Sequence, residues 1–433
     1  MAITLSLPAV QTKLGQLATQ KINNDYKSDI TVGRVSISFF GSVNLHDILI
    51  RDYRKDTLVS VKNIRTDLLS FKNLYHGQLQ FGTIRAANLF LNLKIYKGEK
   101  ASNLDRFILL FETKEKPEEP PFLLSAKKVY VQNSRFTYTD ENAANPVFLK
   151  LNKLQSVIQS FNITGPNVAA KINELNFLDH RGLYVQKLAA DFSYTKSKLE
   201  LKKLAVKTRQ SHFLGVLTFT YRLEDFADFN NKVQINLQVD SASIASNEIA
   251  LFYNELGKNQ QYEMKGLFKG TLNHLNASSV VLTDNLGSKI KGDVTFLNLI
   301  SKTGRDVSIY GNFSEISSHY DALVKTLPNI LGKQLPQQFQ KLGTFSFAGD
   351  LGVSPQALSA NFSATTSIGN MQADITIDAL TDSNRAAYKG NVVLNQFNLG
   401  ILFGRKDLGA ISCNVDIESD ENCSIKTSPY LFS

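Results

Sequence analysis

The side chains that could perform acid–base or metal chemistry in this chain are few and widely spaced. Its six histidines stand at positions 46, 76, 180, 212, 274 and 319, and none forms the HxH, HxxxH or HExxH spacing of a metal site. Two adjacent pairs, His46 with Asp47 and Asp179 with His180, would point to opposite faces of a strand. The sequence has no GxSxG, Walker A or GxGxxG motif. We therefore predict no catalytic residue, no metal site and no cofactor, and we place an enzymatic function such as hydrolysis last.

Composition narrows the remaining classes of function. The two cysteines, Cys413 and Cys423, lie close to the C-terminus without zinc-ligand spacing, and such sparse thiol usage suits an oxidising envelope compartment. The net charge of +9 fits an anionic membrane surface, nucleic acid or no specific partner. The aromatic residues are mostly Phe and alternate with Leu rather than with Lys or Arg, which favours packing over base stacking. We therefore predict no nucleic-acid partner.

The elements that would position any functional side chain are strands, because apolar and polar residues alternate along much of the chain. Two segments show the pattern most clearly, with apolar positions at Leu89, Leu91, Leu93 and Ile95, and at Val233, Ile235, Leu237 and Val239. The residues between them include Asn92, Lys94, Lys232, Gln234 and Asn236. Period two is the signature of a strand with one apolar and one wetter face. The sequence therefore predicts a mainly β protein built on an elongated antiparallel sheet.

Helical periodicity interrupts this pattern in four places, near residues 8–23, 103–112, 246–257 and 320–341. In the first helix Pro8 suits the first turn, and Val10, Leu14, Leu17 and Ala18 are expected on the packed face. In the last, Pro328 and Pro336 are expected to break the helix into short pieces. Residues 28–400 should otherwise be strands and turns.

The length of 433 residues suggests more than one domain. We expect an N-terminal β region with a capping helix over residues 1–112, a charged Pro-rich loop over 113–121, and a repeated β region with helical insertions over 122–411. We predict that the alternation ends over residues 412–433, which contain both cysteines, so we expect a poorly packed tail from 413 on and suspect a truncation or frameshift there. The apolar start is too short for a membrane span and lacks signal-peptide features, so we expect no anchor or signal peptide in this chain.

Short segments in consistent order resemble the N-terminal portion of TamB proteins of Bacteroidetes type, which belong to the AsmA-like superfamily. The segments are Leu5–Leu14, Ser36–Gly41, Asn44–Ile48, Asp56–Leu58, Leu69–Leu74, Thr164–Val168, Phe252–Glu255, Leu327–Gly332 and Tyr388–Val392. The resemblance covers about residues 5–411. These motifs are structural, and they imply a sheet curled into an open, taco-like trough with an apolar interior.

The resemblance also implies a cellular role. Members of this family are periplasmic proteins anchored in the inner membrane, and this chain would be a fragment of a longer protein. The first implied function is a non-enzymatic, bridge-like conduit whose partners are phospholipid acyl chains moving between the inner and outer membranes. The alternative is a scaffold of the translocation and assembly module, which works with an Omp85-type outer-membrane barrel in protein insertion or secretion.

The two alternating segments named above are the candidate lining of a lipid groove. An inward apolar side chain is buried against an acyl chain about as well as against protein, so the same pattern fits an open trough or a closed β-sandwich. An open trough leaves the apolar face without a second protein layer, whereas a sandwich buries it completely. Deciding between them requires the exposure of these side chains in the folded chain.

Overall fold

The computed structural model describes residues 8–38, 42–68, 78–111, 121–143, 146–253, 256–300, 306–328, 332, 335–378, 387–419 and 425–427. Strands account for 64% of the structure and helices for 15%, which confirms the predicted mainly β class. The chain divides into two compact units, Met1–Val233 and Gln234–Ser433. The segment 113–121 lies within the first unit, and its residues 113–120 are outside the described part.

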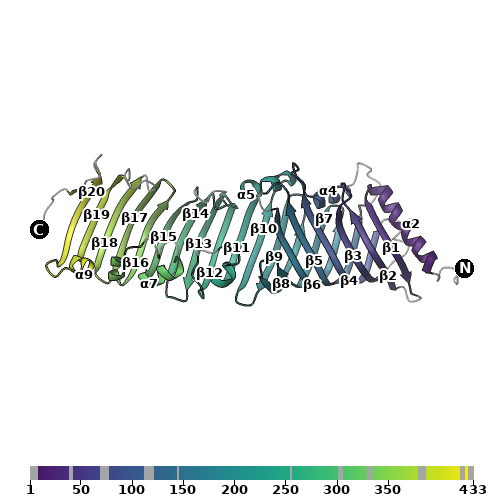
Figure 1. The fold of residues 1–433 in the computed structure, drawn as a ribbon, viewed down its shortest axis with the longest axis horizontal. Coiled ribbons are helices and arrows are strands. Elements are labelled where there is room, and N and C mark those ends of the chain that lie inside the picture. Colours follow the sequence, from purple (N-terminus) through teal and green to yellow (C-terminus); the bar gives the residue numbers. More distant parts are fainter. Residues whose placement is uncertain are drawn as a thin grey trace. The chain divides into compact units, whose positions relative to one another are not determined.

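Unit 1 is an open sheet in which each strand pairs with its neighbours in sequence (Figure 1). Its strands are β1 (Asp29–Ile37), β2 (Ser42–Arg51), β3 (Thr57–Leu68), β4 (Gln78–Ile95), β5 (Leu123–Asp140), β6 (Val147–Thr164), β7 (Asn167–Asp179), β8 (Tyr184–Tyr194), β9 (Lys198–Lys207) and β10 (His212–Thr220). Its helices are α2 (Pro8–Tyr26), α4 (Asn103–Leu109), η1 (Leu223–Asp228) and α5 (Phe229–Lys232).

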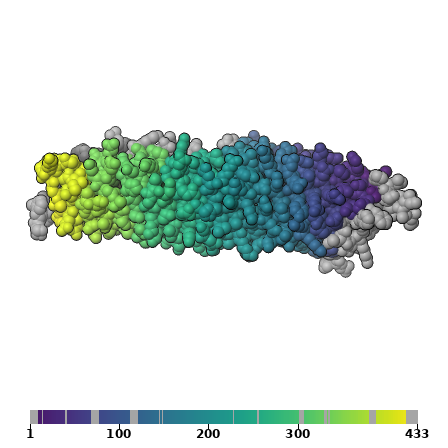
Figure 2. Space-filling model, turned by 90° about the horizontal axis from the view of Figure 1, so that it is seen from below, coloured from purple at the N-terminus to yellow at the C-terminus, as the bar shows by residue number. Residues whose placement is uncertain are grey.

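Unit 2 continues the same design in strands that pair in chain order, so that colour changes steadily across its surface (Figure 2). Its strands are β11 (Gln234–Ala245), β12 (Gln261–Thr271), β13 (His274–Asp284), β14 (Lys289–Leu297), β15 (Ser308–His319), β16 (Thr344–Val353), β17 (Ala357–Thr366), β18 (Gly369–Asp378), β19 (Ala387–Asn398), β20 (Ala410–Ser419) and β21 (Ile425–Thr427). Its helices are α6 (Ser246–Ile249), α7 (Tyr320–Thr326), η2 (Gln337–Leu342) and α9 (Leu399–Phe403).

One strand pair departs from the predicted antiparallel arrangement. β4 and β5 run parallel, with Gln78 opposite Leu123 and Ile95 opposite Asp140. A parallel pair needs a long crossover because the chain must return to the starting end of the first strand. The segment between Ile95 and Leu123, which includes α4, makes this return. β4 and β5, which flank the Pro-rich stretch in sequence, therefore belong to one sheet of unit 1.

The N-terminal helix is present as predicted, but its packed face is partly polar. Leu17 is 50% exposed, whereas Gln11 is 6% exposed and contacts β1. The side chain of Leu14 lies outside the described part. The expectation was wrong for Leu17, whereas Val10 and Ala18 are half-buried. Polar side chains share the packed face because α2 lies along the free edge of β1, where the groups needing a partner are backbone N–H and C=O.

Three side chains of α2 hydrogen-bond the backbone of β1 in the manner of a neighbouring strand. The Gln11 amide donates to the Ile37 carbonyl at 2.9 Å and accepts from its N–H at 2.8 Å. Asn23 makes the equivalent pair with Ile30 at 2.8 and 2.9 Å. The Thr12 hydroxyl donates to the Val35 carbonyl and accepts from its N–H, both at 3.2 Å. The helix thus satisfies the edge of the sheet.

The remaining helices are shorter than the periodicity suggested. α4 begins with a capping box in which the Ser102 side chain accepts from the Asp105 N–H and the Asp105 carboxylate accepts from the Ser102 N–H. α7 ends at Thr326 before Pro328, and η2 begins directly after Pro336, as the two prolines predicted. No helix in the described ranges combines the length and apolar character that crossing a bilayer requires.

The prediction of a poorly packed segment from residue 413 was wrong for residues 413–419. These residues belong to β20, in which Ile411, Cys413, Val415 and Ile417 alternate with exposed polar residues. The alternation was overlooked because cysteine, a small apolar residue, occupies an inward position. Residues 420–424 and 428–433, including Cys423, lie outside the described part.

Candidate functional site

The strand register of unit 2 defines one continuous apolar face. Residues opposite one another in an antiparallel pair lie on the same face, so each ladder carries the face to the next strand. Across β16–β20 this face is lined by Phe347, Leu351, Ala360, Phe362, Ala364, Met371, Ala373, Ile375, Val392, Leu394, Cys413 and Val415. Phe347 and Phe362 stack with ring centroids 4.6 Å apart. The opposite face carries Ser, Thr, Asn, Gln and Asp.

This apolar face is only half-buried. In β16, Phe345, Phe347 and Leu351 are of intermediate exposure while the residues between them are mostly exposed, and β18 and β20 repeat the pattern. Fully buried residues on this face are few: Ala360 and Ala373 are small, and Phe397, which is 3% exposed, lies at the end of β19 just before α9. In a closed sandwich the large apolar side chains of this phase would be completely buried. The face therefore has no second layer of protein over most of its described length.

The apolar face of unit 1 contains a local shift in the alternation. Ile48, Val61 and Ala86 form a buried cluster against which Leu89 packs, so Ala86 and Leu89 share a face although they are three residues apart. Asn88 lies between them with a left-handed φ of 56°. This irregularity shifts the alternation of side chains between the two faces by one residue. Asp47, Asn133 and Lys153 on other strands of this sheet also have positive φ angles.

The eight residues proposed from sequence fall into two groups. Leu89, Leu91, Leu93, Ile235 and Leu237 are half-buried on their strands. Ile95, Val233 and Val239 are at most 3% exposed, so their side chains contact protein. Val233 also precedes β11 and belongs to unit 1, so it does not share a strand with Ile235. The large apolar residues of β16–β20 were not singled out, although the alternation in Thr344–Val353 carries the same signal.

One end of the unit 1 face is closed by α4 and a polar network. The Asp52 carboxylate is 3% exposed and accepts from the Tyr96 hydroxyl at 2.6 Å and the Asn103 amide at 3.0 Å. Asn103 in turn accepts from the Lys94 N–H at 2.9 Å. These bonds join the β2–β3 turn, the end of β4 and the start of α4. Their complete pairing identifies a structural clamp.

Tyrosines from distant strands surround Asp105 of α4. The Tyr194 hydroxyl of β8 donates to the Asp105 carboxylate at 3.3 Å, although β4 and β8 would be about 19 Å apart in a flat sheet. The unit 1 sheet therefore curls towards α4. Burial raises the pKa of Tyr138 to about 12, with Asp140 and Asp105 contributing, and burial also raises the pKa of Tyr194 well above its usual range. These hydroxyls stay protonated at all ordinary pH values.

Helical connections border the apolar face of unit 2 at one end of its strands. α6, α7 with η2, and α9 each follow a strand that runs in the same direction, so they gather at the same edge (Figure 1). The Gly257 N–H donates to the Thr326 carbonyl at 2.9 Å and links the first two connections. Phe339 and Phe403 on this edge are 45% and 59% exposed. The edge is therefore apolar and accessible.

The adjacent acidic and histidine residues do not form a catalytic arrangement. The His46 Nδ1 atom lies 2.7 Å from the Asn63 amide oxygen. Asp179 and His180 stand at the end of β7 rather than within a strand, so they approach to 3.5 Å instead of pointing apart as expected. Burial by itself would raise the pKa of Asp179, but hydrogen bonds and charge from Arg181 outweigh it and lower the pKa. Within the described ranges, no three His, Cys, Asp or Glu residues gather as metal ligands would.

The geometry therefore offers an apolar face that protein covers only in part, most clearly in unit 2, and a polar face behind it. Comparison of the chain with protein-family models, with curated proteins and with solved structures finds no match.

Proposed function

We propose that this chain is a non-enzymatic, lipid-binding part of an envelope protein that holds phospholipid acyl chains along its apolar faces. The observation that carries the proposal is the partial exposure of large apolar side chains at alternate positions, as on β16, β18 and β20. Contiguous apolar surface of this kind is rare on soluble proteins unless something binds it. An acyl chain is the simplest ligand, because it needs no hydrogen bonds from a sheet whose backbone is already paired.

The resemblance to the N-terminal portion of TamB proteins supports a more specific role. In this role the chain is a segment of a longer periplasmic bridge, anchored in the inner membrane, along which phospholipid moves between the inner and outer membranes. The polar face remains in water, and the apolar edge formed by η2 and α9 gives tails access to the unit 2 face. Assembly of outer-membrane proteins with an Omp85-type barrel has less support, because α2 covers the β1 edge on which a client strand would add.

Two neighbouring positions of β11 provide the sharpest test. Ile235 is half-buried on the apolar phase and Gln234 is exposed on the other phase. Ile235→Glu places a charge beside the acyl chain and is expected to reduce co-purifying phospholipid about tenfold or more, since an unpaired charge in an apolar site costs several kcal/mol. Gln234→Glu introduces the same charge towards water and is the matched control. Phospholipid is measured by mass spectrometry after organic extraction of each purified protein.

Photocrosslinking extends the test to both units. A photoreactive residue at Leu91 or Ile235 is expected to capture lipid, and one at Asn92 or Gln234 is not. Equal capture on the two phases, or unfolding of the Ile235→Glu protein in circular dichroism, would contradict the proposal. Equal capture would show that lipid does not prefer the apolar face. Unfolding would show that this face is an ordinary closed core.

A further inference from the structure

The polar face of unit 1 contains a basic hollow that the acyl-chain proposal does not use. Because Ala86 lies in the apolar cluster, its neighbours Arg85 and Ala87 face the other side of the sheet. An open hollow of about 220 Å³ lies around them, lined by Asn44, His46, Asn63, Ile64, Arg65, Arg85, Ala86, Ala87 and Gln132. The lining consists mainly of cationic and amide side chains around the small side chain of Ala87.

Two arginines in this hollow stand directly opposite each other. The register of β3 and β4 pairs Arg65 with Arg85, and both side chains are exposed. Like charges at directly opposed positions destabilise a strand pair. The nearest acidic residue along β3, Asp67, accepts a hydrogen bond from Ser42 at 3.0 Å. In the described part of the chain, neither arginine has a carboxylate within ion-pair distance.

Aromatic rings, rather than carboxylates, hold the surrounding cations. The Arg85 guanidinium lies 5.1 Å and the Lys128 ammonium 5.0 Å from the centre of the Tyr130 ring. Arg135 lies 4.9 Å from the centre of the Phe90 ring. Cation–π contacts orient these groups without neutralising them. The positive charge of the hollow is therefore available to a ligand.

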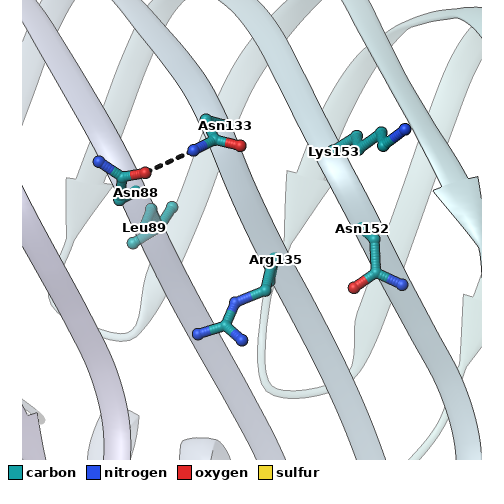
Figure 3. A pocket seen from close by; sticks show the side chains of 6 residues that line it. All are labelled: Asn88, Leu89, Asn133, Arg135, Asn152 and Lys153. Carbon is teal, nitrogen blue, oxygen red and sulfur yellow. Dashed lines mark hydrogen bonds between the residues drawn. The ribbon is translucent and has the colours of Figure 1, made fainter.

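A second hollow, on β4, β5 and β6, is lined in part by amide side chains. The Asn88 amide oxygen accepts a hydrogen bond from the Asn133 amide at 2.6 Å. Figure 3 shows this bond bridging two strands beside Arg135. Asn152 of β6 lines this second hollow, whereas Lys153 extends away from Asn88 and Asn133 (Figure 3). Amide donors beside guanidinium groups are suited to oxygen-rich anions, because guanidinium binds two oxygens of one group at once.

We propose that the first hollow, around Ala87, binds a phosphate-type oxyanion between Arg65 and Arg85. The bound anion would relieve the repulsion of the two guanidinium groups, and the amides of Asn63 and Gln132 would hydrogen-bond its remaining oxygens. The same chemistry is offered by a soluble phosphate compound and by the phosphate of a phospholipid headgroup. The site lies on the face opposite the apolar cluster, so it does not depend on acyl chains occupying the other face.

The test uses the full chain with Arg65→Gln, Arg85→Gln and the control Lys269→Gln. Lys269 is an exposed strand residue of unit 2, so its replacement removes the same charge elsewhere. Binding of inorganic phosphate and of glycerol 3-phosphate is measured by calorimetry. Binding to phosphatidylglycerol vesicles, with phosphatidylcholine vesicles as reference, is measured by flotation. Each arginine substitution is expected to weaken binding of the recognised probe about tenfold or more, because a charged hydrogen bond is lost.

The two probe arms identify the source of the phosphate. Loss in calorimetry assigns the site to a soluble phosphate compound, and loss in flotation alone assigns it to a headgroup. A second readout separates a ligand site from a structural one: without ligand, Arg65→Gln is expected to raise the melting temperature, because it removes the repulsion. Equal binding by all four proteins, an equal loss in Lys269→Gln, or a lower melting temperature of Arg65→Gln would overturn the proposal.

Discussion

At the scale of single residues, the chain separates groups that hold the fold from groups that are left available. Asp52 and Asn103 are almost completely buried, and the hydrogen bonds from Tyr96 and Asn103 to Asp52 join separate segments of unit 1. Arg65 and Arg85 are exposed and lack a described counter-ion. Buried polar groups without partners are costly, so the pairing of Asp52 is required for folding. Exposed cations without partners are not required for folding, which makes them the better candidates for binding.

The ion pair beside this clamp predicts a pH effect. The Lys94 ammonium, 3.0 Å from the Asp56 carboxylate, and the Tyr96 hydroxyl lower the pKa of Asp56. A carboxyl whose pKa is lower in the folded state stabilises the protein above its unfolded pKa, near 4, and loses this contribution as pH falls through the folded pKa.

The free energy of unfolding of the wild type should therefore exceed that of Asp56→Asn by a constant amount above about pH 5, and the gap should narrow below pH 4. Denaturant titrations of both proteins measure this gap between about pH 2.5 and 7, a range that brackets the pKa values of carboxyl groups. A gap that stays constant down to the acidic limit would show that the ion pair does not contribute.

At the scale of elements, α2 acts as a substitute strand. A sheet edge with free N–H and C=O groups is a template for aggregation, and natural sheets cover such edges. Here the cover is a helix whose Gln11, Thr12 and Asn23 side chains reproduce the ladder bonds of a strand. This solution requires polar residues at helical spacing on the packed face, the reverse of an ordinary amphipathic helix.

Removal of these side chains is predicted to uncover the edge. The triple variant Gln11→Ala, Thr12→Val and Asn23→Ala should lose about 1 kcal/mol of stability for each side chain, because paired backbone groups become unpaired. It should also self-associate through β1, as measured by light scattering after gel filtration. The exposed Gln16 and Gln20 provide the control, and their double alanine variant should behave as the wild type. A triple variant that matches this control in both measurements would contradict the role of α2.

At the scale of the whole molecule, each unit is an open sheet with an apolar face that protein covers only in part. Bound lipid would supply the missing layer, so folding stability should depend on lipid. A ligand that binds the folded state adds RT ln(1 + [L]/Kd), about 2.7 kcal/mol at a hundredfold excess over Kd.

We therefore predict that delipidated protein melts at a lower temperature than protein purified with lipid, and that added phospholipid restores the difference. Circular dichroism in the far ultraviolet follows the transition, and Ile235→Glu serves as the variant in which restoration should be smaller. If delipidation leaves the melting temperature unchanged in both proteins, the apolar faces do not hold stabilising lipid.

Much of the fold was predictable because it follows from local periodicity. Period-two alternation in Gln234–Val239 and helical periodicity near Pro8 depend on backbone geometry within a few residues, and both features are present. The prolines at 328 and 336 likewise act within one turn of helix. The mainly β class and the positions of the short helices could therefore be read from the sequence.

The features that decide function depend on contacts between residues far apart in the chain. Whether an apolar phase is covered or open depends on what packs over it, so Ile95 and Leu91 have the same sequence signal but different burial. The opposition of Arg65 and Arg85 exists only because β3 and β4 pair in one register. The polar face of α2 has meaning only beside the free edge of β1. Sequence determined which faces are apolar and polar through local alternation, whereas the tertiary structure decided which of those faces remain open, because strand register and packing join residues far apart in the chain.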